Sequence, residues 1–355
     1  MIYQSDRTMK FSKKIALLMI AAGVMAAVSC KKDDDSTALP SLEGKLTFYL
    51  PQFIAPGETL TMTPSGAIHP EDKGLGYYWK VSPSMSVSDT TRLENGLSPE
   101  GEESDGSFTY KFSDTLRVYV VSAYAFADGY NGISASKSVT TVKPGLDGSL
   151  ANTGILASDE HITIDGQNYY YKRIGELDWF RNNLGVKTGG MPYGNADIMS
   201  DVFGRFYSYE DALKACPEGW RLPTEEDWIA LGEALGATSE KYGTIKGVAA
   251  KLMADATFNG ADMWDYWPAV GTITNESGFA AVPAGYINLG PKNAQGEYPE
   301  AASNGVYSYS VFWTADSVEG DSTMAYYRYI VDNQPDVFIT KGDKQNFGAS
   351  VRCVR

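Results

Sequence analysis

The chain has 355 residues and a mass of 38.6 kDa, which is too long for one ordinary domain and suggests roughly two. With 43% hydrophobic and 12% aromatic residues, its composition is that of a folded chain rather than a disordered one. The formal charge of −14 argues against a nucleic-acid partner, because phosphate binding needs a basic protein face.

The N-terminus has the features of an export signal. Basic residues within 10–14 precede an unbroken apolar and small-residue run over 15–28, too short to span a bilayer comfortably but suited to a signal-peptide core. The run ends in Ala-Val-Ser-Cys at 27–30, which resembles a bacterial lipobox. Residues 1–29 are therefore predicted to be a lipoprotein signal peptide starting at Met1 or Met9, with Cys30 lipidated and held in the outer-membrane lipid. A secreted protein with a free Cys30, or a weak transmembrane anchor, is the alternative.

A charged run, Lys-Lys-Asp-Asp-Asp, follows at 31–35. By itself it is only a solvated segment. It resembles, however, the acidic surface-export signal behind the lipidated cysteine of Bacteroidetes lipoproteins. On that resemblance the protein faces the cell exterior, and residues 30–40 form a lipidated tether, of which residues 31–40 reach at most about 35 Å.

The region 41–143 is predicted to be all β-structure. Short alternating segments are separated by Gly, Pro, Ser and Asp clusters, and they lie at 45–50, 59–63, 77–81, 116–124 and 136–142. About a hundred residues of this kind suit a β-sandwich. Trp79 within Tyr-Trp-Lys-Val resembles the buried tryptophan of immunoglobulin-like modules, so an immunoglobulin-like β-sandwich is expected over 41–143. A turn-rich linker is expected over 144–154.

Helices are expected in the following region. Thr224 and Asp227 form a capping box that opens a helix through Trp228 and Leu231, ending near Gly236. A short helix is expected over 209–215 and a weaker one over 246–256. Beyond Thr257 the chain consists of loops and short strands, so the region as a whole is predicted to be α+β.

A set of motifs in this region resembles the Fibrobacter succinogenes major paralogous domain, which is common in Bacteroidetes surface lipoproteins. The motifs are Trp179, Asn183-Leu184, 203–208 (FGRFYS), 216–224 (CPEGWRLPT), 278–285 (GFAAVPAG), 312–314 (FWT) and 350–354 (SVRCV). The resemblance covers 155–355 and implies a C-type-lectin-like fold, distantly related to the formylglycine-generating enzymes. The family has no established reaction that the resemblance could assign to this chain.

The motif residues themselves are typical of structural positions. Trp220 and Leu222 alternate with Arg221, as in a strand with one buried face, and Phe279, Val282 and Trp313 are expected in the core. With Cys30 assigned to lipid, Cys216 and Cys353 remain in an oxidising compartment, where a disulfide between them is expected. Two buried free thiols are the alternative.

An enzyme is not expected. The two histidines, His69 and His161, are far apart in sequence, so a zinc site or a Ser-His-Asp centre has little to be built from. The formylglycine-generating relatives use a reactive cysteine pair and a metal, and here the only late cysteine is Cys353. The paired carboxylates at 225–226, and Asp262 with Asp265, are more typical of a helix cap and a solvated loop than of acid–base catalysis.

The sequence offers better candidates for ligand-binding residues than for catalytic ones. Asp262, Trp264, Asp265 and Trp267 combine aromatic faces with carboxylates in one loop, as sugar and protein ligands require. Gln334 and Asp336, around Pro335, repeat the calcium-and-sugar tripeptide of C-type lectins, but its Trp-Asn-Asp partner is absent. No cofactor is therefore expected, and calcium has only weak support. For the loop residues the alternative is a place in the core of that loop. For the tripeptide the alternative is a coincidental turn.

The leading hypothesis from the sequence is a cell-surface lipoprotein with a lectin-like head that recognises a glycan or a surface protein. A structural subunit of a surface or pilus-like assembly is the alternative, and a formylglycine-generating-type enzyme is the third option.

Overall fold

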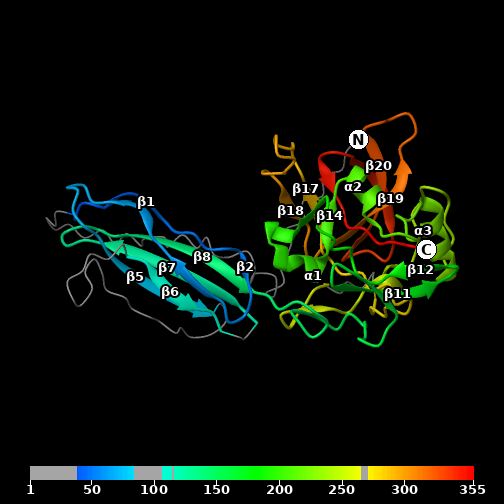
Figure 1. Ribbon diagram of the computed structural model, residues 1–355, viewed down its shortest axis with the longest axis horizontal. Helices are drawn as coiled ribbons and strands as arrows, with labels where there is room; N and C mark the ends of the chain where they lie inside the picture. The colour runs from blue at the N-terminus through cyan, green and yellow to red at the C-terminus, as the bar shows by residue number, and fades with distance from the viewer. Residues whose placement is uncertain (1–37, 84–105, 114–115, 265–270) are drawn as a thin grey trace, which may run out of the picture. The chain divides into compact units, whose positions relative to one another are not determined.

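The computed structural model describes residues 38–83, 106–113, 116–264 and 271–355. This part of the chain is mostly β-structure, arranged in small sheets, and divides into two compact units between Thr141 and Val142 (Figure 1). The predicted leader, Cys30 and the acidic run after it lie outside the described residues, as do Asp265 and Trp267. None of the helices in the described ranges is long and apolar enough to cross a membrane.

The first unit is built from strands. They are β1 (Glu43–Thr47), β2 (Phe53–Ile54), β3 (Thr59–Met62), β4 (Ser65–Ile68), β5 (Gly76–Pro83), β6 (Phe108–Lys111), β7 (Val118–Phe126) and β8 (Ile133–Thr141). A four-stranded sheet has the order β2-β8-β7-β5, and β1-β4 and β3-β6 form two antiparallel pairs. All five strands expected in this region are present with shifted ends, while β2, β4 and β6 have no counterpart in the prediction.

One hydrophobic core serves these sheets. Along β7 the burial alternates, with Tyr119, Val121 and Ala123 inside, as period-two side chains on a half-buried strand require. Trp79 of β5 is buried among them, and its Nε1 donates a hydrogen bond to the Gly106 carbonyl at 2.9 Å. The expectation that Trp79 is a core residue is confirmed.

The second unit contains short helices and further strands. The helices are α1 (Ser200–Phe203), α2 (Tyr209–Ala215), α3 (Glu225–Ala234) and α4 (Ala249–Leu252). The strands are β9 (Leu150–Ala151), β10 (His161–Ile164), β11 (Gln167–Ile174), β12 (Leu177–Phe180), β13 (Gly190–Pro192), β14 (Arg205–Tyr207), β15 (Thr257–Phe258), β16 (Ala261–Asp262), β17 (Tyr286–Asn288), β18 (Ala302–Asn304), β19 (Tyr309–Ser317), β20 (Met324–Val331), β21 (Phe338–Asp343) and β22 (Phe347–Gly348).

The helices follow the sequence signals closely where those signals are strong. Helix α2 has the expected bounds, and α3 begins after Thr224 with both hydrogen bonds of the capping box present. Helix α4 is much shorter than the expected 246–256. Gly247 has a φ of +73°, outside the helical range, and Val248 at the N-cap offers no side-chain hydrogen bond.

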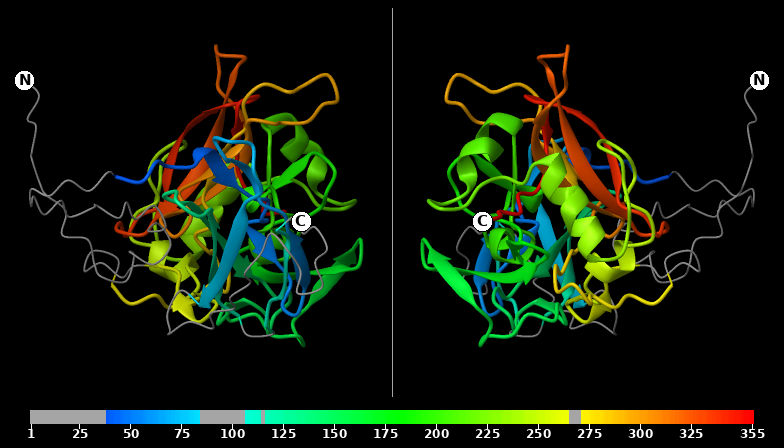
Figure 2. Two further views of the ribbon diagram at one scale, coloured as in Figure 1. Left: turned by 90° about the vertical axis from the view of Figure 1, so that its left-hand side faces the viewer. Right: turned by 90° about the vertical axis from the view of Figure 1, so that its right-hand side faces the viewer.

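The strands of the second unit depart further from expectation. Residues 150–151, within the predicted linker, form β9 and pair with β15, so this segment belongs to a sheet with the order β16-β15-β9. The sheet β19-β20-β21 has strands of up to nine residues, in a region where only short ones were expected. Helix α3 lies beside this sheet, as the yellow-green helix and orange strands in Figure 2 show.

The C-terminal segment 349–354 runs through the middle of the second unit. Val354 bridges to both Trp179 and Arg221, and Ser350 bridges to Phe312 of β19. Hydrophobic residues of this segment contribute to two core clusters, one around Trp228 and Phe279 and one around Trp313. Trp220 and Leu222 are buried with Arg221 exposed, as expected, although Arg221 makes only an isolated bridge and not a full strand.

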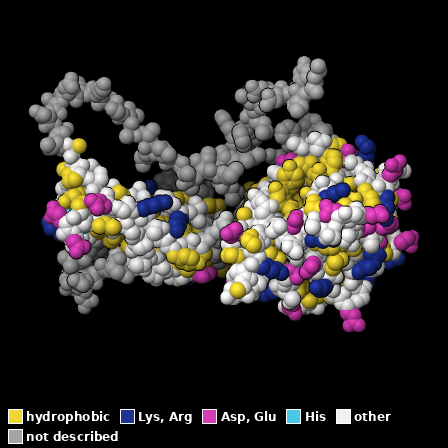
Figure 3. All heavy atoms as spheres, turned by 90° about the horizontal axis from the view of Figure 1, so that it is seen from above, with side chains coloured by type: hydrophobic (Ala, Val, Ile, Leu, Met, Phe, Trp, Pro, Cys, Tyr) yellow, Lys and Arg dark blue, Asp and Glu magenta, His cyan; other side chains and the backbone are white. Residues whose placement is uncertain are grey.

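A disulfide joins Cys216 to Cys353, with a Cα–Cα distance of 5.8 Å. The expected pairing is confirmed, and the alternative of two free thiols is excluded. The bond holds the residue after α2 to the C-terminal segment. On the face of the second unit seen in Figure 3, acidic and basic side chains are interspersed with hydrophobic ones.

Candidate functional site

A cavity of about 420 Å³ lies within the second unit. Its wall is formed by β11, by the segment that follows β12, by α1, and by the segments around Ala280 and Arg352. The volume falls in the range of small-molecule sites, roughly 300–1,000 Å³. Residues far apart in the sequence therefore meet around a space that can hold a ligand.

Arg181, directly after β12, is one of two buried arginines in the wall. Its side chain is 7% exposed and forms an ion pair with Asp159. Its Nε donates to the Gly278 carbonyl at 2.7 Å and its Nη2 to the Gly154 carbonyl at 2.6 Å. These bonds fix the guanidinium in place and balance its charge.

Arg352, in the C-terminal segment, is the second buried arginine in the cavity wall. It is 1% exposed, and its Nε donates to Asn183 Oδ1 at 2.7 Å. The other hydrogen bonds go to backbone carbonyls, from Nη1 to Phe180 at 3.0 Å and Phe279 at 2.6 Å, and from Nη2 to Ala280 at 3.1 Å. Burial, with repulsion from Arg181, lowers the pKa of Arg352 to about 9. Arg352 is thus held by neutral groups alone.

Two side-chain amides present donors to the cavity. Asn182 Oδ1 accepts the Tyr170 backbone N–H at 3.0 Å, and Gln167 Oε1 accepts the Tyr169 hydroxyl at 2.7 Å. The Tyr169 hydroxyl donates in that bond and accepts the Gly185 N–H at 3.1 Å. The amide nitrogens therefore face away from these partners, and neither makes a hydrogen bond to the described residues.

An acidic group lies at the exposed edge of the cavity. Asp201 is in α1, and burial of part of its carboxyl raises its pKa, although Lys187 acts in the opposite direction. Asp201 can accept hydrogen bonds, so the wall offers both acceptors and donors. Among the described residues of the wall there is no His, Cys or Lys, so these side chains offer hydrogen bonds rather than a nucleophile paired with a base.

The backbone around the cavity adopts unusual conformations. Ala280 is buried with a φ of +57°, and its N–H donates to Asn275 Oδ1 at 2.9 Å. Gly204 has a φ of +73°, and a Cβ at this position would lie 2.5 Å from Cβ of Asn183. Left-handed backbone costs free energy at a non-glycine residue such as Ala280, whereas Gly204 adopts it without that cost.

The binding residues expected from the sequence lie elsewhere. Trp264 is 2% exposed in the core, and its Nε1 donates to the Ala281 carbonyl at 3.3 Å, so its ring offers no face to a ligand. Asp262 is exposed on β16. Gln334 is in a turn, and Asp336 Oδ1 accepts the Gly247 N–H at 2.8 Å, which ties this turn to the start of α4. None of these four residues lines the cavity.

The site around Arg352 was not among the sequence predictions. Arg352 and Asn183 stand in motifs that carry the family resemblance, and residues of those motifs are typical of structural positions. The available signal was the arginine within Ser-Val-Arg-Cys-Val, since a charged residue inside an apolar segment needs a buried partner or a ligand.

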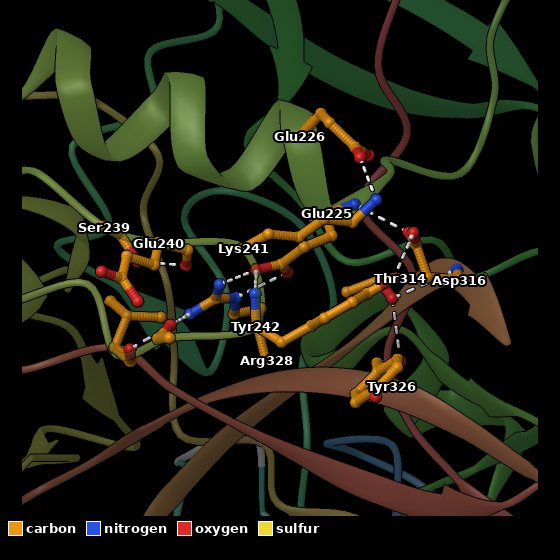
Figure 4. A network of polar contacts seen from close by, with 12 residues as sticks. Glu225, Glu226, Ser239, Glu240, Lys241, Tyr242, Thr314, Asp316, Tyr326 and Arg328 are labelled. Atoms are coloured by element: carbon orange, nitrogen blue, oxygen red, sulfur yellow. Dashed lines mark hydrogen bonds and ion pairs between the residues drawn. The ribbon is translucent and has the colours of Figure 1, made fainter. Parts of the chain in front are cut away.

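A buried acid–base pair elsewhere in the unit is the other candidate site. Glu225, the first residue of α3, accepts Arg328 Nε at 3.0 Å and the Tyr242 backbone N–H at 3.0 Å (Figure 4). Both charged side chains are completely buried. No ligand can reach them, so the pair fixes the start of α3 against β20 and is structural. Across the described ranges, no group of three His, Cys, Asp or Glu side chains is placed to hold a metal ion.

Comparison with known proteins supports the motif analysis. No curated protein and no solved structure matches the chain. The family model described as the Fibrobacter succinogenes major domain matches residues 173–355, more than half of the chain, and includes Asn182, Asn183, Asp201 and Arg352 of the cavity wall. The chain therefore belongs to the Fibrobacter succinogenes major domain family.

Proposed function

We propose that the protein is a cell-surface lipoprotein whose second unit is a lectin-like binding head, and that this head binds a glycan in the cavity. The observation that carries the proposal is the pair of amide donors on Gln167 and Asn182, which have no acceptor among the described residues and belong to side chains that line the cavity. Sugar hydroxyls match such donors, and Asp201 supplies an acceptor for them.

The remaining parts of the proposal follow from the sequence. The apolar run at 15–28 and the lipobox-like end at Cys30 support lipid anchoring in the outer membrane, and the acidic run after Cys30 supports exposure to the cell exterior. The first unit, with Trp79 in a core shared by its sheets, would serve as an immunoglobulin-like spacer. The second unit would have the C-type-lectin-like fold that its family implies.

A glycan array tests the proposal. The full chain is applied with calcium and with a chelator, beside the variants Gln167→Ala and Asn182→Ala. Each variant should weaken binding by about tenfold, because each removes a hydrogen bond from a buried ligand group. Gln295→Ala is the matched control, since Gln295 is an exposed amide outside the cavity wall. No glycan binding in either condition, or binding that both cavity variants leave unchanged, would refute the proposal.

Assembly with other chains is the second candidate, favoured by aromatic side chains on the outer face of the first unit's sheet. Tyr78 stacks on Phe126 with ring centroids 4.4 Å apart, and Tyr124, 41% exposed, lies beside them. Aromatic residues on a sheet surface are frequent in interfaces between chains. Analytical ultracentrifugation of the full chain over a range of concentrations would reveal assembly, and Tyr124→Lys should abolish it.

A further inference from the structure

Four arginines are buried within the described residues, and three of them have a carboxylate partner. Arg181 pairs with Asp159, Arg205 with Asp197 at 3.0 Å, and Arg328 with Glu225. Buried charges in proteins are normally paired, because the loss of hydration is large and an opposite charge compensates for it. Three of these four buried arginines follow the rule.

Arg352 is the fourth buried arginine, and it makes no ion pair with the described residues. Its acceptors are one amide oxygen and three backbone carbonyls, and its guanidinium lies 4.6 Å from the ring centroid of Phe279. These groups carry partial charges and orient the guanidinium, but they bring no full negative charge. At Arg352 the compensating charge is therefore missing from this part of the chain.

Arg352 is also part of the cavity wall, whereas Arg328, which is equally enclosed, has its carboxylate inside the protein. The hydrogen bonds of Arg352 account for four of its five N–H groups, so one N–H on Nη2 is left without an acceptor among the described residues. Because Arg352 lines the cavity, an anionic group on a ligand there would supply the missing charge.

We infer that the ligand of this cavity is an acidic saccharide, whose carboxylate pairs with Arg352 and whose hydroxyls bind the amides of Gln167 and Asn182. The inference rests on the proposed glycan-binding function and specifies its ligand class. Asp159 already balances the charge of Arg181, so Arg352 is the cation left for the ligand, while Asp201 at the edge opposes an anion and limits its affinity. Neutral sugars satisfy the amides but leave Arg352 uncompensated.

The test measures binding of matched sugars to the full chain by calorimetry and on an array. Glucuronate and galacturonate are compared with glucose and galactose, which differ only in carrying CH₂OH in place of the carboxylate. Glucose 6-sulfate distinguishes a requirement for a carboxylate from a requirement for any oxyanion. The acidic sugars should bind about tenfold or more tightly than their neutral counterparts, as expected for a hydrogen-bonded charge pair.

Two variants assign the effect to the cavity. Arg352→Gln should remove the preference for acidic sugars, and formation of the Cys216–Cys353 disulfide reports whether this variant has folded. Asp201→Asn should strengthen binding of the acidic sugars several-fold, because it removes a like charge. Glu319→Gln, which makes the same charge change at an exposed turn outside the wall, should have no effect.

The outcomes separate the inference from the proposed function. Equal binding of neutral and acidic sugars would overturn the acidic ligand and leave glycan binding intact. Acidic sugars that bind with no response to Arg352→Gln and Asp201→Asn would also overturn it, since the anion would then bind elsewhere. The absence of binding to every sugar on the array would refute the proposed function itself. If glucose 6-sulfate binds and the uronates do not, the inferred carboxylate is wrong and the anionic group of the ligand is a sulfate ester.

Discussion

Glu225 and Glu226 are neighbours in the sequence, yet their surroundings differ completely. The Glu225 carboxylate is buried against Arg328, whereas Glu226 forms an exposed pair with Lys241. Removing one partner of a buried ion pair destabilises the fold, because the other charge is left without hydration or a counter-charge. The two residues thus form a natural comparison.

We expect Glu225→Gln to lower the free energy of unfolding by about 3–5 kcal/mol, because it leaves the Arg328 charge buried and unpaired. Urea denaturation of the full chain measures the change. In Glu226→Gln the denaturation curve should coincide with that of the parent, since water and salt screen an exposed pair. Equal effects of the two substitutions would show that Glu225 is not the counter-charge of Arg328.

At the scale of residues, sequence patterns identified core positions better than the site. Trp79 and Trp313 are buried as expected, because large apolar side chains in regular patterns have one favourable environment. Trp264 had two plausible environments, loop core and ligand platform, and its burial in the core cluster with a hydrogen bond to the Ala281 carbonyl distinguishes them. The cavity depends on Asn182, Asp201 and Arg352 meeting in space, which no local pattern encodes.

Helix α3 begins at a charged cap whose strength depends on pH. Asp227 Oδ2 accepts the Thr224 N–H at 2.7 Å, and Oδ1 accepts Arg221 Nη2 at 3.0 Å. Burial acts to raise the pKa of Asp227, but these hydrogen bonds outweigh it and the pKa is lowered. A lowered pKa in the folded chain means stability that is present above the ordinary carboxyl pKa and is lost as the pH falls.

We therefore expect Asp227→Asn to destabilise the chain at pH 7 by about 0.5–2 kcal/mol, the usual value of a helix cap. The difference from the parent should shrink as the pH falls below about 4, where the unfolded carboxyl begins to be protonated. Urea denaturation at several pH values measures it. A difference that stays constant from pH 7 to 3 would show that the charge of Asp227 contributes nothing.

The Cys216–Cys353 disulfide links the end of α2 to the C-terminal segment across a sequence separation of 137 residues. The chain-entropy model gives up to about 5 kcal/mol for a loop of this length. We expect the double variant Cys216→Ser, Cys353→Ser to lose about 2–5 kcal/mol in urea denaturation, and reductant to destabilise only the parent. A parent chain that is insensitive to reductant would contradict this expectation.

Among the elements, α2 and α3 were predicted well, α4 is much shorter than expected, α1 had no counterpart in the prediction, and the strands of the second unit were predicted less well. The capping box and the spacing of Trp228 and Leu231 define α3 locally. Strand β20 carries half-buried tyrosines on one face and buried Arg328 and Ile330 on the other, so its sequence lacks the alternation of polar and apolar residues that marks a strand. Strand β9 has two residues and exists only because β15 pairs with it, so no local sequence pattern could predict it.

Taken as a whole molecule, the chain contains separate cores on either side of Thr141 and Val142. A unit with its own core and its own disulfide should fold by itself. We expect the fragment 142–355 to unfold cooperatively, with a midpoint close to that of the second unit in the full chain. Near-UV circular dichroism during thermal unfolding measures both. A fragment without fixed tertiary signals would show that the first unit is needed for folding.

The position of the C-terminal segment has a consequence for biogenesis. Residues 349–354 contact β19, Trp179 and Arg221, and Arg352 and Cys353 make their bonds only from this segment. The bridges from Val354 to Trp179 and Arg221 join positions more than a hundred residues apart, so they close long loops and form late in folding. The first unit needs none of these contacts, so it can fold while the second unit is still being synthesised. A variant that lacks residues 349–355 should therefore leave the second unit unfolded and open to proteolysis.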